Sequence, residues 1–177
     1  MIKKACIILA CMVSLLFVSC GKKINPYDVG TKAYMFGDYH KAFLVYSEAC
    51  NEGDSFMCYS TARMFEEGLS VKQDPMKAYK HYVKACNGGI GIACNAAAKM
   101  LKEGKGIRQD LKQAIEFYMM ACNNGLALGC YSAGTMYYNK EGAPEDKAMT
   151  KELFGKACDF GDQKGCEVYR KLNEAGY

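Results

Sequence analysis

Cysteine is the residue type with the clearest chemical spacing in this chain of 177 residues, which contains eleven cysteines. Eight of them form four pairs with seven residues inside each pair. Each pair follows the previous one by 36 residues: Cys50 and Cys58, Cys86 and Cys94, Cys122 and Cys130, Cys158 and Cys166. Two thiols at a fixed short spacing can form a disulfide or contribute ligands to a metal ion.

The spacing favours disulfides over a metal site. Zinc sites usually have two to four residues between paired cysteines and four converging ligands, whereas the only histidines here are His40 and His81. A strict period indicates a repeat array, and a tight turn between two helices can bring the Cα atoms of each pair to the ~5–6 Å that a disulfide needs. We therefore predict four bridges within repeats, each closing a loop of about nine residues and contributing ~2–3 kcal/mol. We expect no metal and no cofactor.

Nucleophilic catalysis has weaker support in the residues. The only Ser-x-x-Lys motif, Ser19 to Lys22, would be broken by removal of an N-terminal signal. A histidine-assisted serine, for example Ser47 or Ser60, stays open without a positive signal. The catalytic residues of any enzymatic activity are therefore unknown from the sequence.

The N-terminus resembles an export signal. Lys3 and Lys4 precede an apolar run of about 14 residues, shorter than the ~20 needed to span a bilayer. Residues 1–19 are therefore predicted to be cleaved. The ending Ser19-Cys20 resembles a bacterial lipobox, although Phe17 stands where Leu is usual, so Cys20 would carry acyl chains and residues 20–24 would form a tether. The alternative is an ordinary signal peptide.

Composition supports a folded, exported chain. Half of the residues are apolar and a quarter are charged, which excludes a disordered or collagen-like protein. The formal charge of +4 falls to about +2 when Lys3 and Lys4 leave with the signal. That balance predicts no nucleic-acid partner. The many cysteines fit an oxidising compartment.

The 36-residue period also predicts the secondary structure. Asp38, Asp74, Asp110 and Asp146 each open a block and are suited to cap a helix. Offsets of 4, 8 and 11 residues from each Asp place small and aromatic residues on one helix face. These residues are Ala42, Ala78, Ala114 and Thr150, then Tyr46, Tyr82, Tyr118 and Phe154, then Ala49, Ala85, Ala121 and Ala157.

A second helix should run back in each block. Glycines after the first cysteine of each pair would end the first helix, at Gly53, Gly89, Gly125 and Gly161. The returning helix carries buried Met64, Met100, Met136 and Leu172, and Gly68, Gly104 and Gly142 should close it. The blocks are a lead-in helix over 25–37, repeats over 38–73, 74–109 and 110–145, and a repeat with a C-terminal cap over 146–177.

The pattern Asp-x3-Ala-x3-Tyr-x2-Ala-Cys, followed by a second Cys, resembles Sel-like repeats, which are relatives of the tetratricopeptide repeat. Cysteines at both places in every repeat are similar to the Helicobacter cysteine-rich protein family. The resemblance covers residues 25–177 and implies an all-α fold, a right-handed α/α solenoid of about nine helices. Because some members of that family are described as penicillin-binding proteins or slow β-lactamases, it also implies β-lactam hydrolysis as an alternative activity.

The leading functional hypothesis is a binding module whose concave face is lined by the second helix of each pair, as the resemblance implies. Polar and aromatic side chains there would suit an extended peptide or a cell-wall glycopeptide. The positions that face the ligand in tetratricopeptide relatives correspond here to Tyr27, Thr31, Tyr59, Arg63, Glu66, Asn95, Lys99, Lys102, Tyr131, Thr135 and Tyr138.

The expected partner is an envelope or host protein, a peptide or a muropeptide, with β-lactams as the alternative ligand. A structural envelope scaffold is the third hypothesis. We expect a monomer that contacts the membrane only through its lipid, as an outer-membrane lipoprotein facing the periplasm or the cell surface. Without the lipid the protein would be periplasmic or secreted.

Overall fold

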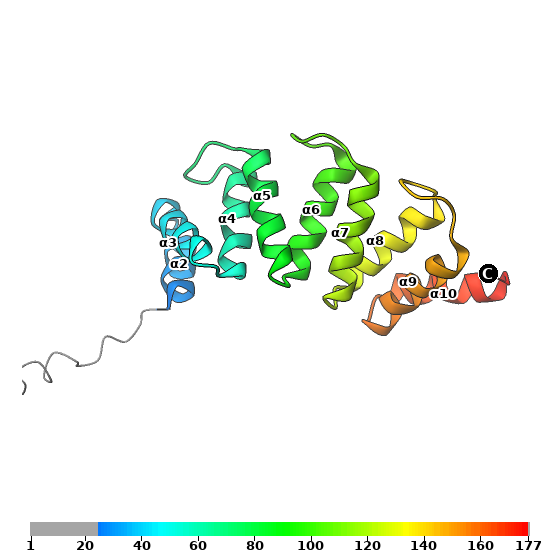
Figure 1. The fold of residues 1–177 in the computed structure, drawn as a ribbon. Helices are drawn as coiled ribbons and strands as arrows, with labels where there is room; N and C mark the ends of the chain where they lie inside the picture. Colours follow the sequence, from blue (N-terminus) through cyan, green and yellow to red (C-terminus); the bar gives the residue numbers. More distant parts are fainter. Residues whose placement is uncertain (1–24, 177) are drawn as a thin grey trace, which may run out of the picture.

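The structure of the protein, a computed structural model, describes residues 25–176. The predicted signal, Cys20 and the tether lie outside this range. Within it the chain forms nine helices and no strand (Figure 1). The helices are α2 (Pro26–Met35), α3 (Tyr39–Asn51), α4 (Ser55–Glu67), α5 (Pro75–Asn87), α6 (Gly91–Glu103), α7 (Leu111–Asn123), α8 (Ala127–Tyr138), α9 (Lys147–Asp159) and α10 (Gln163–Glu174).

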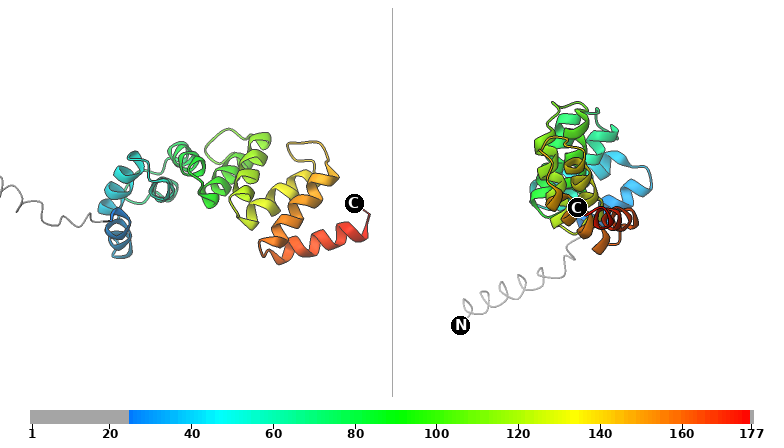
Figure 2. Two further views of the ribbon diagram at one scale, coloured as in Figure 1. Left: turned by 60° about the horizontal axis from the view of Figure 1, so that its bottom comes forward. Right: turned by 90° about the vertical axis from the view of Figure 1, so that its right-hand side faces the viewer.

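The helices form a single curved row, which confirms the predicted solenoid of helix pairs (Figure 2). Each helix packs mainly against the helix before it and the helix after it in sequence. Short turns join the two helices of a pair at one edge of the row, and longer loops over 68–74 and 104–110 join successive pairs at the other edge (Figure 1). Stability therefore depends on contacts between neighbours rather than on one central core.

Aspartate caps start most of the helices, as predicted. The Asp74 and Asp110 carboxylates each accept the backbone N–H three residues later, at 2.9 Å. This pairs an amide that the first helical turn leaves free. Gly68 ends α4 in the left-handed conformation with φ of 72°. The same role predicted for Gly142 was wrong, because α8 already ends at Tyr138, before the loop that contains Gly142.

The periodic positions form the core. In the first repeat Ala42, Tyr46 and Ala49 are buried, as the helical offsets predicted. The methionines of the returning helices are also buried, with exposed fractions of 1% for Met64 and 0% for Met136. Small residues and aromatic rings alternate on these faces, so adjacent helices can approach closely.

The four predicted disulfides are present, one in each repeat. Cys86 and Cys94 bridge the turn between α5 and α6 with their Cα atoms 4.6 Å apart, and the other three pairs have the same arrangement. These distances lie inside the range that a disulfide requires. Because all eight cysteines are oxidised, none of them is a thiolate that could bind a metal.

His81 is the half-buried histidine of the core. Its ring stacks on Phe65, with centroids 5.5 Å apart, and its Nδ1 lies 3.5 Å from Cys50 Sγ. Burial lowers the pKa of His81, and the positive charges of Lys84 and Lys77 lower that pKa further. Lys84 is held nearby because its Nζ donates to the Cys50 carbonyl at 2.6 Å.

We expect acidification to weaken the fold through His81. A histidine with a lowered folded pKa binds fewer protons in the folded state than in the unfolded state. Its stabilising contribution is therefore complete above the unfolded pKa of ~6.5 and is lost as pH falls toward the folded pKa. Chemical unfolding of the parent between pH 7.5 and 5.5 should show a falling free energy of unfolding, and H81Q should flatten that slope. H40Q, at an exposed histidine, is the control; an equal slope in parent and H81Q would contradict this assignment.

Candidate binding groove

The second helices of the pairs line the inner side of the curved row. Helix α6 contacts α8 directly, although α7 separates them in sequence. In a curved array, helices on the inner side come closer to one another than those on the outer side. The residues proposed for the concave face are carried by α2, α4, α6 and α8, so they belong to this inner side.

The first of two neighbouring pockets lies between α2 and α4 and measures about 210 Å³. Four of the residues carried over for ligand contact line it: Tyr27, Thr31, Tyr59 and Arg63. Burial raises the pKa of Tyr46, which also lines this pocket, and the neighbouring Thr31 side chain opposes that rise. The structure thus brings these four side chains together from two separate helices.

The second pocket lies between α4 and α6 and measures about 370 Å³. Tyr59 and Arg63 line it as well, so the two pockets adjoin at these side chains. Three further residues that were predicted to face a ligand also line this pocket: Glu66, Asn95 and Lys99. We call the two pockets together the inner groove; it runs from α2 to α6.

Aromatic rings follow the inner groove. Tyr27 meets Phe56 edge to face with centroids 5.7 Å apart, and Tyr59 lies 6.2 Å from Phe56 on its other side. Tyr59 is then 5.8 Å from the buried Tyr82 of α5. Such rings offer apolar contact area with little loss of side-chain freedom, so they suit recognition of an extended ligand.

Charges of both signs surround the second pocket. Arg63 Nε donates to Glu67 at 3.0 Å, and Lys99 lies 3.8 Å from Glu103. Glu66 accepts a 2.6 Å hydrogen bond from the Tyr82 hydroxyl, and burial together with this carboxylate raises the pKa of Tyr82. Because the ion pairs are largely exposed, water screens them and a ligand can compete for the cations.

Asn95 has an incomplete set of hydrogen bonds. Its Oδ1 is buried and has no hydrogen-bond partner among the described residues. A buried acceptor without a donor is unfavourable by ~1–3 kcal/mol. Asn95 lines the second pocket, so a rotamer that exposed this oxygen there would let a ligand N–H pair with it.

The remaining carried-over residues do not line the inner groove. Lys102 pairs with Glu141 at 2.8 Å and thereby ties α6 to the loop after α8, and this contact lowers the pKa of Glu141. Tyr131 packs edge to face on Phe154, and the Thr135 hydroxyl donates to the Tyr131 carbonyl at 2.8 Å. Tyr138 is half exposed at the end of α8.

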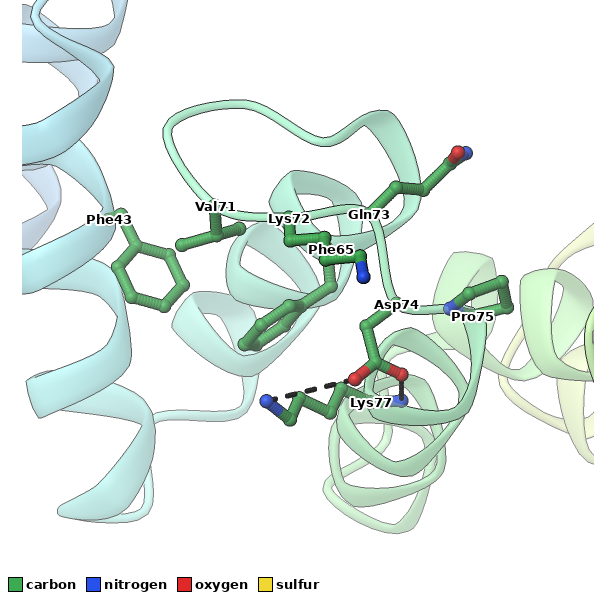
Figure 3. Close-up of a pocket in the computed structure, with 8 residues that line it drawn as sticks. All are labelled: Phe43, Phe65, Val71, Lys72, Gln73, Asp74, Pro75 and Lys77. Carbon is green, nitrogen blue, oxygen red and sulfur yellow. Dashed lines mark hydrogen bonds and ion pairs between the residues drawn. The ribbon is translucent and has the colours of Figure 1, made fainter.

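A third pocket, of about 580 Å³, lies beside the loop between α4 and α5 and was missing from the sequence predictions (Figure 3). Phe43 and Phe65 meet edge to face there, and Lys77 approaches both Asp74 and the Phe65 ring. The signal available in the sequence was the aromatic pair Phe43 and Tyr79, which lie 36 positions apart; Tyr79 contacts a different partner, Phe117, edge to face.

The serine hydroxyls proposed for histidine assistance serve their own helices. Ser47 and Ser60 donate to the carbonyls of Leu44 and Phe56. Instead, Ser70 Oγ lies 3.4 Å from His40 Nδ1, and both residues are exposed. Acyl transfer also requires donors for an oxyanion and a group that orients the base. β-Lactam hydrolysis therefore stays a prediction from the resemblance.

The model of the Sel1 repeat matches residues 27–54, 55–90, 91–126 and 127–162. The chain belongs to the Sel1 repeat family. Each Sel1 repeat in this phase begins with the second helix of a pair, and the first begins in α2. No curated protein matches the chain in sequence.

Solved structures agree with the Sel1 repeat fold. A Sel1 repeat protein from Oxalobacter formigenes has a TM-score of 0.75 and 18% identity, covering 82% of this chain and 59% of its own. A protective antigen of uropathogenic Escherichia coli has a TM-score of 0.70 and 18% identity, covering 84% and 33%. This chain therefore spans less than two thirds of either protein.

The cysteine-rich protein B of Helicobacter pylori is also similar, with 27% identity and a TM-score of 0.58 over 74% of this chain and 94% of that protein. This similarity confirms the resemblance drawn from the cysteine spacing. In residues 25–176 no three His, Cys, Asp or Glu side chains are grouped to hold a metal ion. No helix in that range has the length and apolar character needed to cross a membrane.

Proposed function

We propose that the protein is an exported binding module whose inner groove holds an extended peptide segment of an envelope or host protein, or the peptide of a muropeptide. The observation that carries the proposal is that Tyr59 and Arg63 line both of two adjoining pockets. A row of pockets along several helices suits an elongated ligand better than a compact substrate. Four disulfides support a location in an oxidising compartment.

Each part of the groove matches a different part of a peptide. The rings of Tyr27, Phe56 and Tyr59 can contact apolar side chains. Asn95 Oδ1 can accept a backbone N–H, and the exposed cations Arg63 and Lys99 can pair with carboxylates.

Substitution of Asn95 by Ala separates binding from stability. We expect N95A to weaken peptide binding about tenfold, a loss of ~1.4 kcal/mol. The free energy of unfolding should stay equal or rise by ~0.5 kcal/mol, because Ala removes an unpaired buried acceptor and favours the helix. The measurements are the Kd for peptides selected on the parent from an array that includes muropeptide stems, and chemical unfolding.

N87A is the matched control, since Asn87 is exposed at the end of α5 and lies outside both pockets. It should bind like the parent. If N95A were destabilised while its Kd matched that of the parent, Asn95 would be structural and the groove assignment would be wrong.

We also propose that Cys20 is acylated and that residues 1–19 are absent from the mature protein. The basic start, the short apolar run and the Ser-Cys ending support this. The intact mass of protein purified from bacterial envelopes should equal that of residues 20–177 plus the acyl groups. A mature chain that retains Cys6, or that begins elsewhere without lipid, would contradict the anchor.

A further inference from the structure

The second helices share a short motif: a small residue, any residue, Met and a large apolar residue. In α4, α6 and α8 the methionine of this motif is buried, with exposed fractions of 1%, 5% and 0% for Met64, Met100 and Met136. Helix α2 ends with the same motif, Ala33-Tyr34-Met35-Phe36, yet Met35 and Phe36 are each 79% exposed. They are the two most exposed large apolar side chains among the described residues.

The exposure has a structural cause. The turn that closes α2 comes earlier relative to this motif than the turn that closes α4. The Asp38 N–H donates to the Ala33 carbonyl, as the Leu69 N–H donates to the Met64 carbonyl. Ala33 therefore holds the place of Met64, and Met35 and Phe36 hold the outward places of Glu66 and Glu67. In the described part of the chain, helix α2 packs extensively against one helix, α3.

An apolar hollow adjoins Phe36 on the same pair of helices. It measures about 350 Å³ and has Val29, Ala33 and Phe36 as its apolar lining. Lys32 and Lys41 border it and are exposed. Asp38, the acidic residue of this border, accepts the Lys41 backbone N–H at 3.1 Å as the cap of α3. Apolar side chains bordered by lysines suit the interface of an anionic bilayer.

The short tether indicates that the anchoring membrane is what lies close to the exposed end of α2. Asn25 is only five positions after Cys20, so an anchor at Cys20 lies at most ~17 Å from the start of α2. Helix α2 is itself only ~15 Å long, so a helix that lies along the membrane brings Met35 and Phe36 within reach of the surface. Lys22 and Lys23, beside the anchor, add positive charge that anionic lipids attract.

From these observations we infer that the N-terminal end of the solenoid docks on the anchoring membrane. Met35 and Phe36 enter the interface between headgroups and acyl chains, and Lys32 and Lys41 lie against lipid phosphates. The inference rests on the proposed acylation of Cys20. Docking holds the first helix pair on the surface, so the row of helices extends from the membrane in a set direction.

Tryptophan fluorescence tests the docking directly, because the chain contains no Trp. F36W places a single reporter at the proposed contact, and F160W places one at the end of α9, where Phe160 is 49% exposed. Full-length acylated protein, verified by intact mass, is reconstituted in phosphatidylcholine–phosphatidylglycerol vesicles with and without brominated acyl chains. Circular dichroism verifies that both variants keep the helical content of the parent.

We expect the emission of the F36W variant to shift to shorter wavelength in vesicles and to be quenched about twofold by brominated lipid, because docked side chains reach ~5–10 Å into the interface. The F160W variant should keep its aqueous emission. Adding K32Q and K41Q to the F36W variant should reduce the quenching of its indole.

Three results would overturn the inference. Equal emission of the F36W and F160W variants in vesicles, with the acyl mass present, would reject docking while leaving the anchor intact. A mature mass without acyl groups would reject the anchor and the docking with it. A shift of the F36W emission already present without lipid, together with a doubled mass in solution, would assign this face to a second copy of the chain.

Discussion

Reduction of all four disulfides is expected to unfold the solenoid. Each bridge closes a loop of about nine residues and contributes ~2–3 kcal/mol, so the four together contribute ~8–12 kcal/mol if their effects add. That sum is comparable to the whole ~5–15 kcal/mol by which a typical domain is stable. Circular dichroism should show loss of helix after reduction and alkylation, whereas the oxidised protein under the same conditions should stay folded.

Removing a single disulfide measures the contribution of one bridge, for comparison with the reduction of all four. C122A/C130A should lower the free energy of unfolding by ~2–3 kcal/mol and leave the protein folded, because the neighbouring repeats still cover its helices. C122A alone should leave Cys130 free to mispair, which non-reducing peptide maps would detect. Full helicity and unchanged cooperativity in the reduced protein would contradict a stabilising role for the bridges.

Truncation of Met136 should produce the largest effect of a single substitution on the core. Met136 has an exposed fraction of 0% in α8, and Gly134 beside it packs against Leu153 and Phe154 of the next repeat. M136A should lower the free energy of unfolding by ~2–5 kcal/mol, through lost burial and the cavity left behind. Urea unfolding monitored by circular dichroism gives the value.

M35A is the control with the same chemical change in the same sequence motif. Because Met35 is 79% exposed, its truncation should change the free energy of unfolding by no more than ~0.5 kcal/mol. Losses of equal size in M35A and M136A would mean that Met35 is covered in the protein in solution. Such a result in lipid-free protein would favour contact with a second copy over contact with the membrane.

Most of the fold could be predicted from the sequence because its determinants are local or repeat at 36 residues. The capping of α5 by Asp74 requires only the three residues that follow it. The link between Cys86 and Cys94 requires one tight turn between two helices. The end of α8 could not be found in this way, because Asn139 and the left-handed Lys140 follow the helix before Gly142 is reached.

The candidate groove was only partly predictable, since a position on a helix face does not identify what comes to cover it. Tyr59 of α4 lines one pocket with Asn95 and Lys99 of α6 and with Tyr82 of the intervening α5. Lys102, 36 residues after Glu66, is half-buried and pairs with Glu141 from the loop after α8, and Tyr131 packs on Phe154 of the next repeat.

The sequence by itself thus determined the repeat, the helices, the bridges and the apolar faces, because each depends on residues close in the chain or at a fixed offset. The tertiary structure decided which exposed residues share a pocket, and it decided that Met35 is exposed where Met64 is buried. The shared pocket depends on which helices lie beside each position. The exposure of Met35 depends on where its helix ends, because Ala33 rather than Met35 holds the place of Met64 before the closing turn.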